Sequence, residues 1–320
     1  MKPSIKTQIE CWIFVAILSA SLGVQAAEGV IRVNEATDGN GRYAMAMVKL
    51  ALSKIDTKYK IVSDLAEVTQ ARNIDDVASG KSDLLWAATN QETEDVLLPI
   101  RIPLYKGLLG HRIFIINPAS QSRFEQVKNF NDLKSFSFGQ GNTWADAAIL
   151  AKNGLKVVKA NKYQSLFYMV DGGRFDAFPR GVQEPWQELV SHPTLSLSVE
   201  KHIMLVYRMP FYLFVSKQNK ALARDLEQGL NIAIADGSFD QIFLNDPMVK
   251  DVLDKANLSN RLVFDLSNPT LPKETPVDRP ELWLDIKTLG EAAGAPHELP
   301  AIVDEAATNV MLKAVVAAAP

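Results

Sequence analysis

The stretch VIRVNEATDGNGRYAMAMVKLALSKIDTKYKIVSD, residues 30 to 64, decides the fold class. Its two ends, Val30–Ala36 and Lys58–Asp64, read as β-strands, the second by its alternation of apolar and polar residues. Between them, apolar residues recur at helical spacing, which predicts a helix over Gly41–Ile55. A strand, a helix and a strand in this order indicate an α/β protein, in which a parallel sheet is covered by helices.

The same alternation continues along the chain. We expect a buried strand over Ser82–Thr89, a second set of strands and helices from His111 onward, and a return strand over Phe211–Lys217. Strands that pass out and back between two such sets predict two lobes joined by two hinge crossings. Each lobe is expected to hold a mixed, mostly parallel sheet flanked by helices. Clefts at the carboxyl ends of such strands are where small ligands bind.

Residues 1–26 show the three-part pattern of a secretory signal peptide. Lysines precede an apolar run that begins at Cys11, and small residues end the segment at Ala26, where we expect cleavage. An uncleaved N-terminal anchor is the alternative. Because Cys11 is the only cysteine, the mature chain would contain no disulfide, thiolate nucleophile or cysteine metal site. The pattern predicts an exported, periplasmic protein.

Composition and motifs exclude several classes of function. The net charge is -3 and no basic stripe is present, which argues against nucleic-acid binding. The chain has no metal-binding spacing of histidines, no GxSxG elbow and no glycine-rich phosphate loop. We therefore expect no cofactor, no metal and no enzymatic activity.

The joint FSFGQGNTWADAAIL, Phe136–Leu150, is the first candidate for a binding site. Two glycines end a strand there, and Asn142 and Thr143 stand just before a predicted helix. Asn and Thr commonly cap helices and glycine turns corners, so a purely local explanation exists. A helix start also offers unpaired N–H groups and a positive dipole end to an anion. The residues alone leave both explanations open.

Four stretches together resemble the periplasmic solute-binding proteins that serve amino-acid transporters. They are IRVNEA, SGKSDLLWAATNQETEDVLLPIRIPLYKG, NFNDLKSFSFGQGNTWADAAIL and YMVDGGRFDAFPRG, and the resemblance runs from about Val30 to Phe264. It implies the type II two-lobe fold of these proteins, with the ligand at the lobe interface. Lobe 1 would comprise residues 27–115 and 211–285, lobe 2 residues 116–210, and a C-terminal appendage residues 286–320.

The resemblance also implies ligand contacts in lobe 2. The joint after Gly141 lies on the cleft in this family, so amides near Asn142 and Thr143, with the Thr143 hydroxyl, would receive a ligand carboxylate. Trp144, at the start of the helix, is either a ligand contact or part of the core. Arg180 stands where the family contacts its ligand, and the alternative is a structural arginine at the hinge. Arg174 and Asp176 are expected to hold the preceding turn.

In lobe 1 the candidates follow strand ends. Asn34 and Glu35 end the first strand and would face the cleft, and Thr89 begins the loop after the buried strand. Trp86 either belongs to the core or forms the floor of the cleft. Arg101 would pair with an anionic ligand group or, alternatively, with a surface carboxylate. Tyr105 and Glu184 are further candidates.

Departures from the family limit the ligand. Amino-acid binders carry an arginine near the place of Glu94 and an aspartate near Arg180 or Gly181, and neither stands here as expected. We therefore expect a monomer that binds a small anionic or carboxylate-bearing metabolite and delivers it to an inner-membrane ABC transporter permease. The alternatives are a ligand-sensing partner of a membrane signalling protein and a lyase built on the same fold.

Overall fold

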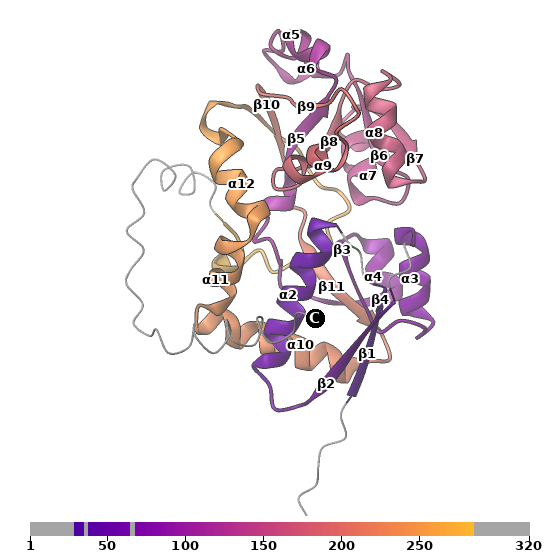
Figure 1. Ribbon diagram of the computed structural model, residues 1–320, viewed down its shortest axis with the longest axis vertical. Helices are drawn as coiled ribbons and strands as arrows, with labels where there is room; N and C mark the ends of the chain where they lie inside the picture. The colour runs from indigo at the N-terminus through magenta and orange to yellow at the C-terminus, as the bar shows by residue number, and fades with distance from the viewer. Residues whose placement is uncertain (1–28, 35–37, 65–67, 285–320) are drawn as a thin grey trace, which may run out of the picture.

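The computed structural model describes residues 29–34, 38–64 and 68–284 of the 320-residue chain. These residues form two lobes, each built around its own sheet, which lie one above the other in Figure 1. The expected signal peptide over residues 1–26 and the expected appendage over residues 286–320 lie outside the described residues. No helix of the described part is both long and apolar enough to cross a bilayer.

The lobe 1 sheet has five strands. Its order is β2 (Tyr59–Asp64), β1 (Gly29–Asn34), β3 (Leu84–Ala88), β11 (Phe211–Ser216) and β4 (Leu97–Ile100). The first three strands are parallel, and β11 runs antiparallel to both of its neighbours. The predicted strands of this lobe are thus confirmed to within two residues. The carboxyl ends of β1, β3 and β4 all point toward lobe 2.

Helices cover both faces of this sheet. Helices α2 (Gly39–Ser53) and α10 (Lys220–Ala235) pack against each other, and α3 (Gln70–Ala78) lies on the opposite face, next to the short α4 (Gln91–Val96). The Asp38 carboxylate caps α2 by accepting a hydrogen bond from the Gly41 amide at 2.8 Å. This cap fixes the start of α2 at the edge of lobe 1 that faces lobe 2.

The lobe 2 sheet gathers strands from three parts of the chain. Its order is β12 (Leu262–Asp265), β10 (Ile203–Val206), β5 (His111–Ile116) and β8 (Phe178–Gly181), and β9 (Ser198–Val199) pairs with β5. The parallel pair β6 (Ser137–Gly141) and β7 (Lys156–Ala160) joins through a bridge between Phe138 and Ala177. The helices of this lobe are α5 (Gln121–Phe124), α6 (Phe130–Leu133), α7 (Ala145–Lys152), α8 (Tyr163–Asp171) and α9 (Pro185–Ser191).

Two strands lie in a different lobe from the one expected. The sequence assigned residues 27–115 and 211–285 to lobe 1, but β5 pairs with β8 and β10, and β12 pairs in parallel with β10. Both strands therefore belong to lobe 2. The apolar run of β5 predicts its strand correctly, whereas β12 was not predicted as a strand. The partner of a strand depends on contacts with distant residues that a local pattern does not contain.

The two expected hinge crossings run side by side. Residues 101–110, which end in the 3-10 turn η1 (Leu108–Gly110), lead from β4 to β5, and residues 207–210 lead back from β10 to β11. The Tyr207 amide donates to the Gly110 carbonyl at 3.0 Å, and the Leu104 amide donates to the Phe211 carbonyl at 2.9 Å. A Cβ atom on Gly110 would lie 1.9 Å from the Tyr207 carbonyl oxygen, so only glycine permits this approach.

The C-terminal part of the described chain crosses between the lobes twice more. Helices α11 (Ser238–Asn245) and α12 (Pro247–Lys255) and the turn η3 (Leu258–Asn260) lead from lobe 1 to β12 in lobe 2. Residues 266–284, which include the turn η4 (Pro280–Leu282), then return, and the Leu284 amide donates to the Lys106 carbonyl at 2.7 Å.

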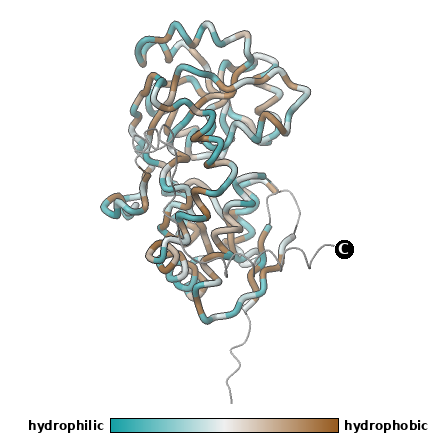
Figure 2. Tube along the Cα trace, turned by 60° about the vertical axis from the view of Figure 1, so that its left-hand side comes forward, coloured by the Kyte–Doolittle hydropathy of each residue, from teal (hydrophilic) through white to brown (hydrophobic). Residues whose placement is uncertain are grey.

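The apolar core is continuous through the hinge. One cluster of buried side chains includes Ile31 of β1, Tyr105 and Leu109 of the first crossing, and Ile113 of β5. Figure 2 shows apolar stretches running through both lobes, with polar residues concentrated on the outer turns. The lobes therefore share packed side chains at the hinge as well as two strands of backbone.

Candidate ligand-binding site between the lobes

Arg180 is the centre of a cluster of charged side chains on the part of lobe 2 that meets lobe 1. It lies on β8, where it is 5% exposed. Its Nε donates to Glu188 Oε1 at 2.9 Å, and its Nη2 donates to Glu188 Oε1 at 2.6 Å and to Glu184 Oε1 at 2.9 Å. Three aromatic rings lie within 5.4 Å of the guanidinium carbon, those of Trp144, Tyr163 and Phe178. Arg180 is thus enclosed by carboxylates and ring faces.

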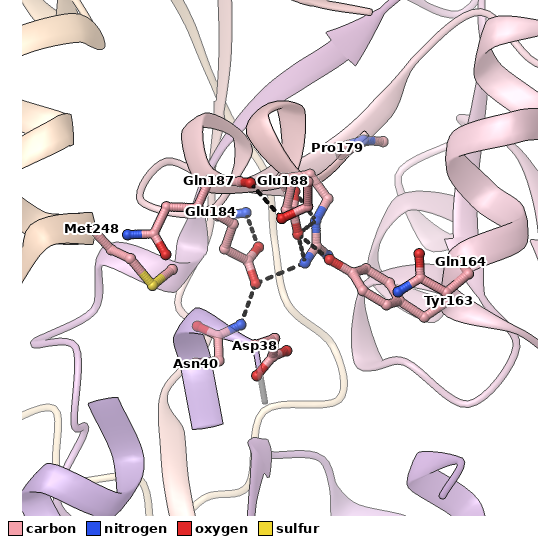
Figure 3. Close-up of polar contacts among 12 residues, drawn as sticks. Asp38, Asn40, Tyr163, Gln164, Pro179, Glu184, Gln187, Glu188 and Met248 are labelled. Carbon is pink, nitrogen blue, oxygen red and sulfur yellow. Dashed lines mark hydrogen bonds and ion pairs between the residues drawn. The ribbon is translucent and has the colours of Figure 1, made fainter. Parts of the chain in front are cut away.

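Glu184 joins both lobes to this arginine. Its carboxylate accepts hydrogen bonds from the Gly181 amide at 2.5 Å and from Arg112 Nη1 at 3.3 Å within lobe 2. It also accepts one from Asn40 Nδ2 of lobe 1 at 2.7 Å (Figure 3). Each carboxylate oxygen therefore has more than one donor, and the position of Glu184 depends on three elements of the fold.

A second arginine lies deeper in lobe 2. Arg112 of β5 is 2% exposed, and its Nη2 lies 2.5 Å from Asp146 Oδ1. Tyr207 donates from its hydroxyl to Asp146 and accepts from Arg112 Nε. Burial alone would lower the pKa of Arg112, but Asp146, Tyr207 and Glu184 raise it. Arg112 therefore stays charged and fixes Asp146 in the first turn of α7.

The charges of this cluster do not balance. Arg112 and Arg180 of lobe 2 supply two cations, whereas Asp146, Glu184 and Glu188 supply three carboxylates. Arg42 and Asp38 of lobe 1 add one cation and one carboxylate nearby, so one carboxylate remains in excess. Burial and the neighbouring Glu184 raise the pKa of Glu188, against the lowering effect of Arg180. Glu188 is therefore the carboxylate of the cluster whose ionised form is least favoured.

The start of α2 forms the lobe 1 face opposite Arg180. Asn40 donates to Glu184, Arg42 Nη2 donates to Gln187 Oε1 at 2.7 Å, and Tyr105 donates from its hydroxyl to Asn40 Oδ1 at 2.9 Å. A Cβ atom on Gly39 would lie 2.3 Å from Met248 Sδ of α12. The two lobes are thus in contact on this side of the cleft, and Figure 3 shows Asp38 and Asn40 below Glu184.

Asp38 brings a further carboxylate to the same place. Its side chain keeps access to solvent, yet desolvation by the protein around it and the charge of Glu184 raise its pKa, while Arg180 and Arg42 lower it. The response of Asp38 to groups of lobe 2 places it on the boundary between the lobes.

Arg101 and Thr89, both predicted as ligand contacts, belong to a separate cluster. Thr89 is fully buried and its hydroxyl donates to Glu94 at 2.5 Å. Arg101 donates with Nη1 and Nη2 to the two oxygens of Glu94, at 3.0 and 2.5 Å, and lies 3.8 Å from Glu274. The alternative of an ion pair within the protein is therefore the one the structure shows. Among the described residues, no hydrogen bond or ion pair joins this cluster to Arg180.

The other predicted residues of lobe 1 have structural contacts. Asn34 Nδ2 donates to Asp76 Oδ2 of α3 at 3.2 Å. Trp86 is half-buried on β3 and packs against the main apolar core. Glu35 lies outside the described residues. The Tyr105 hydroxyl, by contrast, does reach the lobe boundary through Asn40.

At the predicted anion site around Asn142 and Thr143, two of the backbone amides already bond to carbonyl groups of the chain. Helix α7 begins at Ala145 with Trp144 as its N-cap, and no side chain caps it. The Asn142 amide donates to the Ala160 carbonyl at 2.9 Å, and the Trp144 amide donates to the Gly141 carbonyl at 3.1 Å. The side chains of Asn142 and Thr143 are exposed at this place. The Asn142 amide, just beyond β6, bonds to β7 because the two strands run side by side in parallel register.

Several residues of the cluster were not predicted, namely Asp38, Asn40, Arg112, Asp146, Tyr163 and Glu188. One signal was present in PRGVQEPWQE, since Glu184 and Glu188 follow Arg180 at intervals of four residues. On a helix start such spacing places carboxylates over the preceding residue. The other members come from distant segments, and their meeting depends on the tertiary fold. The described residues hold no group of three or more His, Cys, Asp or Glu side chains suited to a metal ion.

No protein-family model and no curated protein sequence matches the chain. Solved structures do match in shape. An ancestral arginine-binding protein bound to arginine aligns with a TM-score of 0.52 and 19% identity, over 69% of this chain and 99% of that one. An arginine-specific periplasmic binding protein of Salmonella typhimurium aligns with a TM-score of 0.51 and 14% identity, over 67% and 97%.

A histidine kinase sensor domain with similarity to periplasmic binding proteins also aligns, with a TM-score of 0.54 and 12% identity, over 70% of this chain and 97% of that one. The chain has the type II fold of periplasmic solute-binding proteins. At these identities the likeness concerns the fold alone. Each of these structures leaves close to a third of this chain uncovered. The expected two-lobe α/β architecture is confirmed.

Proposed function

We propose that this chain is an exported, monomeric solute-binding protein that captures a small metabolite between its lobes and delivers it to an inner-membrane ABC transporter. The observation that supports this most is the meeting of Arg180, Glu184 and Asn40 across the lobe boundary. A charged, hydrogen-bonded cluster at the interface of two lobes is the usual setting of a ligand site. The structural likeness to amino-acid-binding proteins agrees with it.

The proposed ligand carries a carboxylate or another anionic group and needs no α-ammonium. Arg180 supports this, because its planar guanidinium can bind a carboxylate through two hydrogen bonds. Arg101 does not, since Glu94 already holds both of its terminal nitrogens. The exposed Thr143 hydroxyl and Asn142 amide group are the other polar side chains offered by the predicted joint. A ligand anion must compete with Glu184 or Glu188 for Arg180.

The binding step is a closure of the two lobes. The contacts of Asn40 with Glu184 and of Arg42 with Gln187 join the lobes, so an open form would lack them. A ligand that touches both lobes shifts the balance toward the closed form by as much as its affinities for the two forms differ. The closed cleft also removes the ligand from water, which strengthens its charged hydrogen bonds.

A thermal-shift screen of small metabolites, with analysis of what is recovered, tests this function. A ligand that binds only the folded chain should stabilise it by about 2.7 kcal/mol at a hundred times its dissociation constant. The ligand should be recovered unchanged. Conversion of a stabilising compound to product would instead support the lyase alternative, and a screen in which no solute raises the melting temperature would contradict solute binding.

A second function deserves the same screen because one matching structure is a histidine kinase sensor domain. As a sensor partner, the loaded lobes would dock on a membrane signalling protein in place of a permease. Cells that lack the chain separate the two functions. Loss of uptake of the labelled ligand supports transport, whereas normal uptake with a lost transcriptional response supports sensing.

A further inference from the structure

The two glutamates on Arg180 are not equivalent. Glu184 also binds the Gly181 amide, Arg112 and Asn40, so it is held from four directions. Glu188 has, apart from Arg180, one side-chain donor among the described contacts, the Tyr163 hydroxyl at 2.6 Å. Glu188 is also the more exposed of the two, at 11% against 4% for its side chain. Glu188 accepts three hydrogen bonds from Arg180 and one from Tyr163, so its departure from Arg180 breaks no contact with Arg112 or with lobe 1, which a movement of Glu184 would break.

The charge count identifies the same residue. With two arginines and three carboxylates, one carboxylate exceeds what the cations of the cluster can neutralise. The groups that face Glu188 are Arg180 on β8, Tyr163 on α8 and Glu184 one turn earlier on α9. His192 faces only its backbone, through a 2.8 Å contact between Nδ1 and the Glu188 carbonyl. Burial and Glu184 raise the pKa of the Glu188 carboxyl, which makes it the group most ready to take up a proton.

We propose that Glu188 is an internal stand-in for the ligand carboxylate: its side chain pairs with the Arg180 guanidinium until an anionic ligand displaces it. The inference rests on the proposed function and deepens it, because it makes Glu188 the residue that sets specificity and pH response at this site. The exchange keeps two hydrogen bonds on Arg180 and replaces one carboxylate by another.

The displaced side chain must be neutralised. Once removed from Arg180, Glu188 still lies in a buried site beside Glu184, where an unpaired carboxylate is costly. It therefore takes one proton from solvent, while the ligand carboxylate stays ionised on Arg180. The net charge of the cluster is unchanged by the whole exchange. Affinity for an anion must then fall as the pH rises above the pKa of Glu188, by up to about tenfold per pH unit.

Calorimetry with simple carboxylates tests this exchange. The probes are acetate, succinate and citrate, and the neutral controls are acetamide and succinamide. Glu188→Gln removes the competing charge and keeps the shape of the side chain, so its affinity for the carboxylates should be about tenfold higher at about pH 8. Its affinity should also be flat between about pH 6 and about pH 8, where the wild type weakens. Titrations in two buffers of different ionisation enthalpy should count about one proton taken up by the wild type and none by the variant.

Two further variants guard against a trivial result. Glu125→Gln removes an exposed carboxylate of lobe 2 and should behave as the wild type. Tyr163→Phe keeps the ring over Arg180 but removes the hydroxyl that holds Glu188, so it should also strengthen carboxylate binding. Tyr163→Phe therefore still tests the exchange if Glu188→Gln does not fold.

The outcomes separate this inference from the proposed function. Carboxylate affinity in Glu188→Gln and Tyr163→Phe no higher than in Glu125→Gln, or an unchanged proton count, would overturn the exchange. If neutral solutes bind and stabilise the protein but the carboxylates gain no affinity in Glu188→Gln, the protein binds solutes but the stand-in role of Glu188 is wrong. If no solute stabilises any variant, the solute-binding function itself is contradicted.

Discussion

Arg180 is a structural arginine as well as a candidate ligand residue. Its removal would leave Glu184 and Glu188 buried with less positive charge to neutralise them. Breaking a buried ion pair from one side typically costs about 3–5 kcal/mol. We therefore expect Arg180→Ala to lower the free energy of unfolding by about that amount without any ligand, measured by urea denaturation. Arg180→Lys keeps the positive charge, so its free energy of unfolding should fall by less than that of Arg180→Ala.

Arg174 is the matched control for this prediction. The sequence suggested that Arg174 and Asp176 hold the turn before β8. Asp176 does so, by accepting from the Ser137 amide and hydroxyl at 2.8 and 2.7 Å. Arg174 is exposed, and exposed substitutions usually change stability by less than about 0.5 kcal/mol. Equal losses in Arg174→Ala and Arg180→Ala would contradict the assignment of Arg180 to a buried network.

His111, at the start of β5, gives a pH prediction. Burial lowers its pKa from 6.5 to about 4, although the Gly107 carbonyl near its Nδ1 acts in the opposite direction. Between these values the unfolded chain binds a proton that the folded chain does not. Stability is therefore lost as the pH falls below about 6.5, by about 1 kcal/mol at about pH 5.5. The raised pKa values of Asp38 and Glu188 act in the opposite sense.

The comparison that isolates His111 is therefore a difference between variants. His111→Gln keeps a donor for the Gly107 carbonyl and does not titrate. Its melting temperature should fall less than that of the wild type when the pH is lowered from about 7 to about 5.5. Parallel pH curves for the two proteins would mean that His111 titrates normally in the folded chain.

At the scale of elements, helix α2 is the part of lobe 1 that engages lobe 2. Asn40 uses both ends of its amide, since it donates to Glu184 and accepts from Tyr105. Asn40→Ala would remove both bonds and leave the Glu184 charge with one donor fewer, which costs about 1–3 kcal/mol. We expect this variant to populate a more open form, seen as a larger radius of gyration in X-ray scattering.

Asn131→Ala, an exposed change on α6 far from this contact along the chain, should leave the scattering unchanged. An equal radius for Asn40→Ala and the wild type would show that the α2 contact does not hold the lobes together. Gly39→Ala provides an independent check, because its Cβ atom would meet the end of the Met248 side chain, which must shift where α2 approaches α12.

The elements also show where sequence reasoning succeeds. Periodicity predicted α2, β1 and β2 because each has one buried face, and the apolar residues of that face recur at the spacing of a helix or a strand. The same reasoning did not predict β12 as a strand, and it placed residues 211–285, which include β12, in lobe 1. The pairing of β12 with β10 depends on the path of α12. At the candidate site, Arg180 was found from the resemblance. Its partner Glu188 was not, because an acidic residue on a helix usually faces solvent.

On the scale of the whole molecule, the C-terminal segment makes this two-lobe protein more constrained than two crossings alone would. Residues 266–284 bond to lobe 2 through the Ser267 carbonyl and Asn153 Nδ2 at 2.8 Å, and to lobe 1 through Arg279 Nη2 and Asn231 Oδ1 at 2.9 Å. Along the way Thr275 is buried beside Tyr212, and Glu274 approaches Arg101. The segment therefore resists any motion that separates Asn153 from Asn231.

This constraint limits how far the lobes can open. Trp283 anchors the segment at the hinge, where its Nε1 donates to the Pro276 carbonyl at 2.9 Å and Arg208 lies over its ring at 4.6 Å. Trp283, Lys106 and His111 line a hinge cavity of about 430 Å³. Ligand binding should make the wild type only slightly more compact in scattering, because the segment already holds the empty form near closure.

Trp283→Ala should release this restraint, since it removes the ring that packs against Gly107 and Arg208. The ligand-free variant should have a larger radius of gyration, and its backbone amides over residues 266–284 should exchange faster with solvent, as expected for a segment that opens locally. Lys273→Ala, an exposed change in the same segment, should show neither effect. Faster exchange without a larger radius would mean that the segment loosens but that the α2 contact and the shared apolar core at the hinge are enough to keep the lobes together.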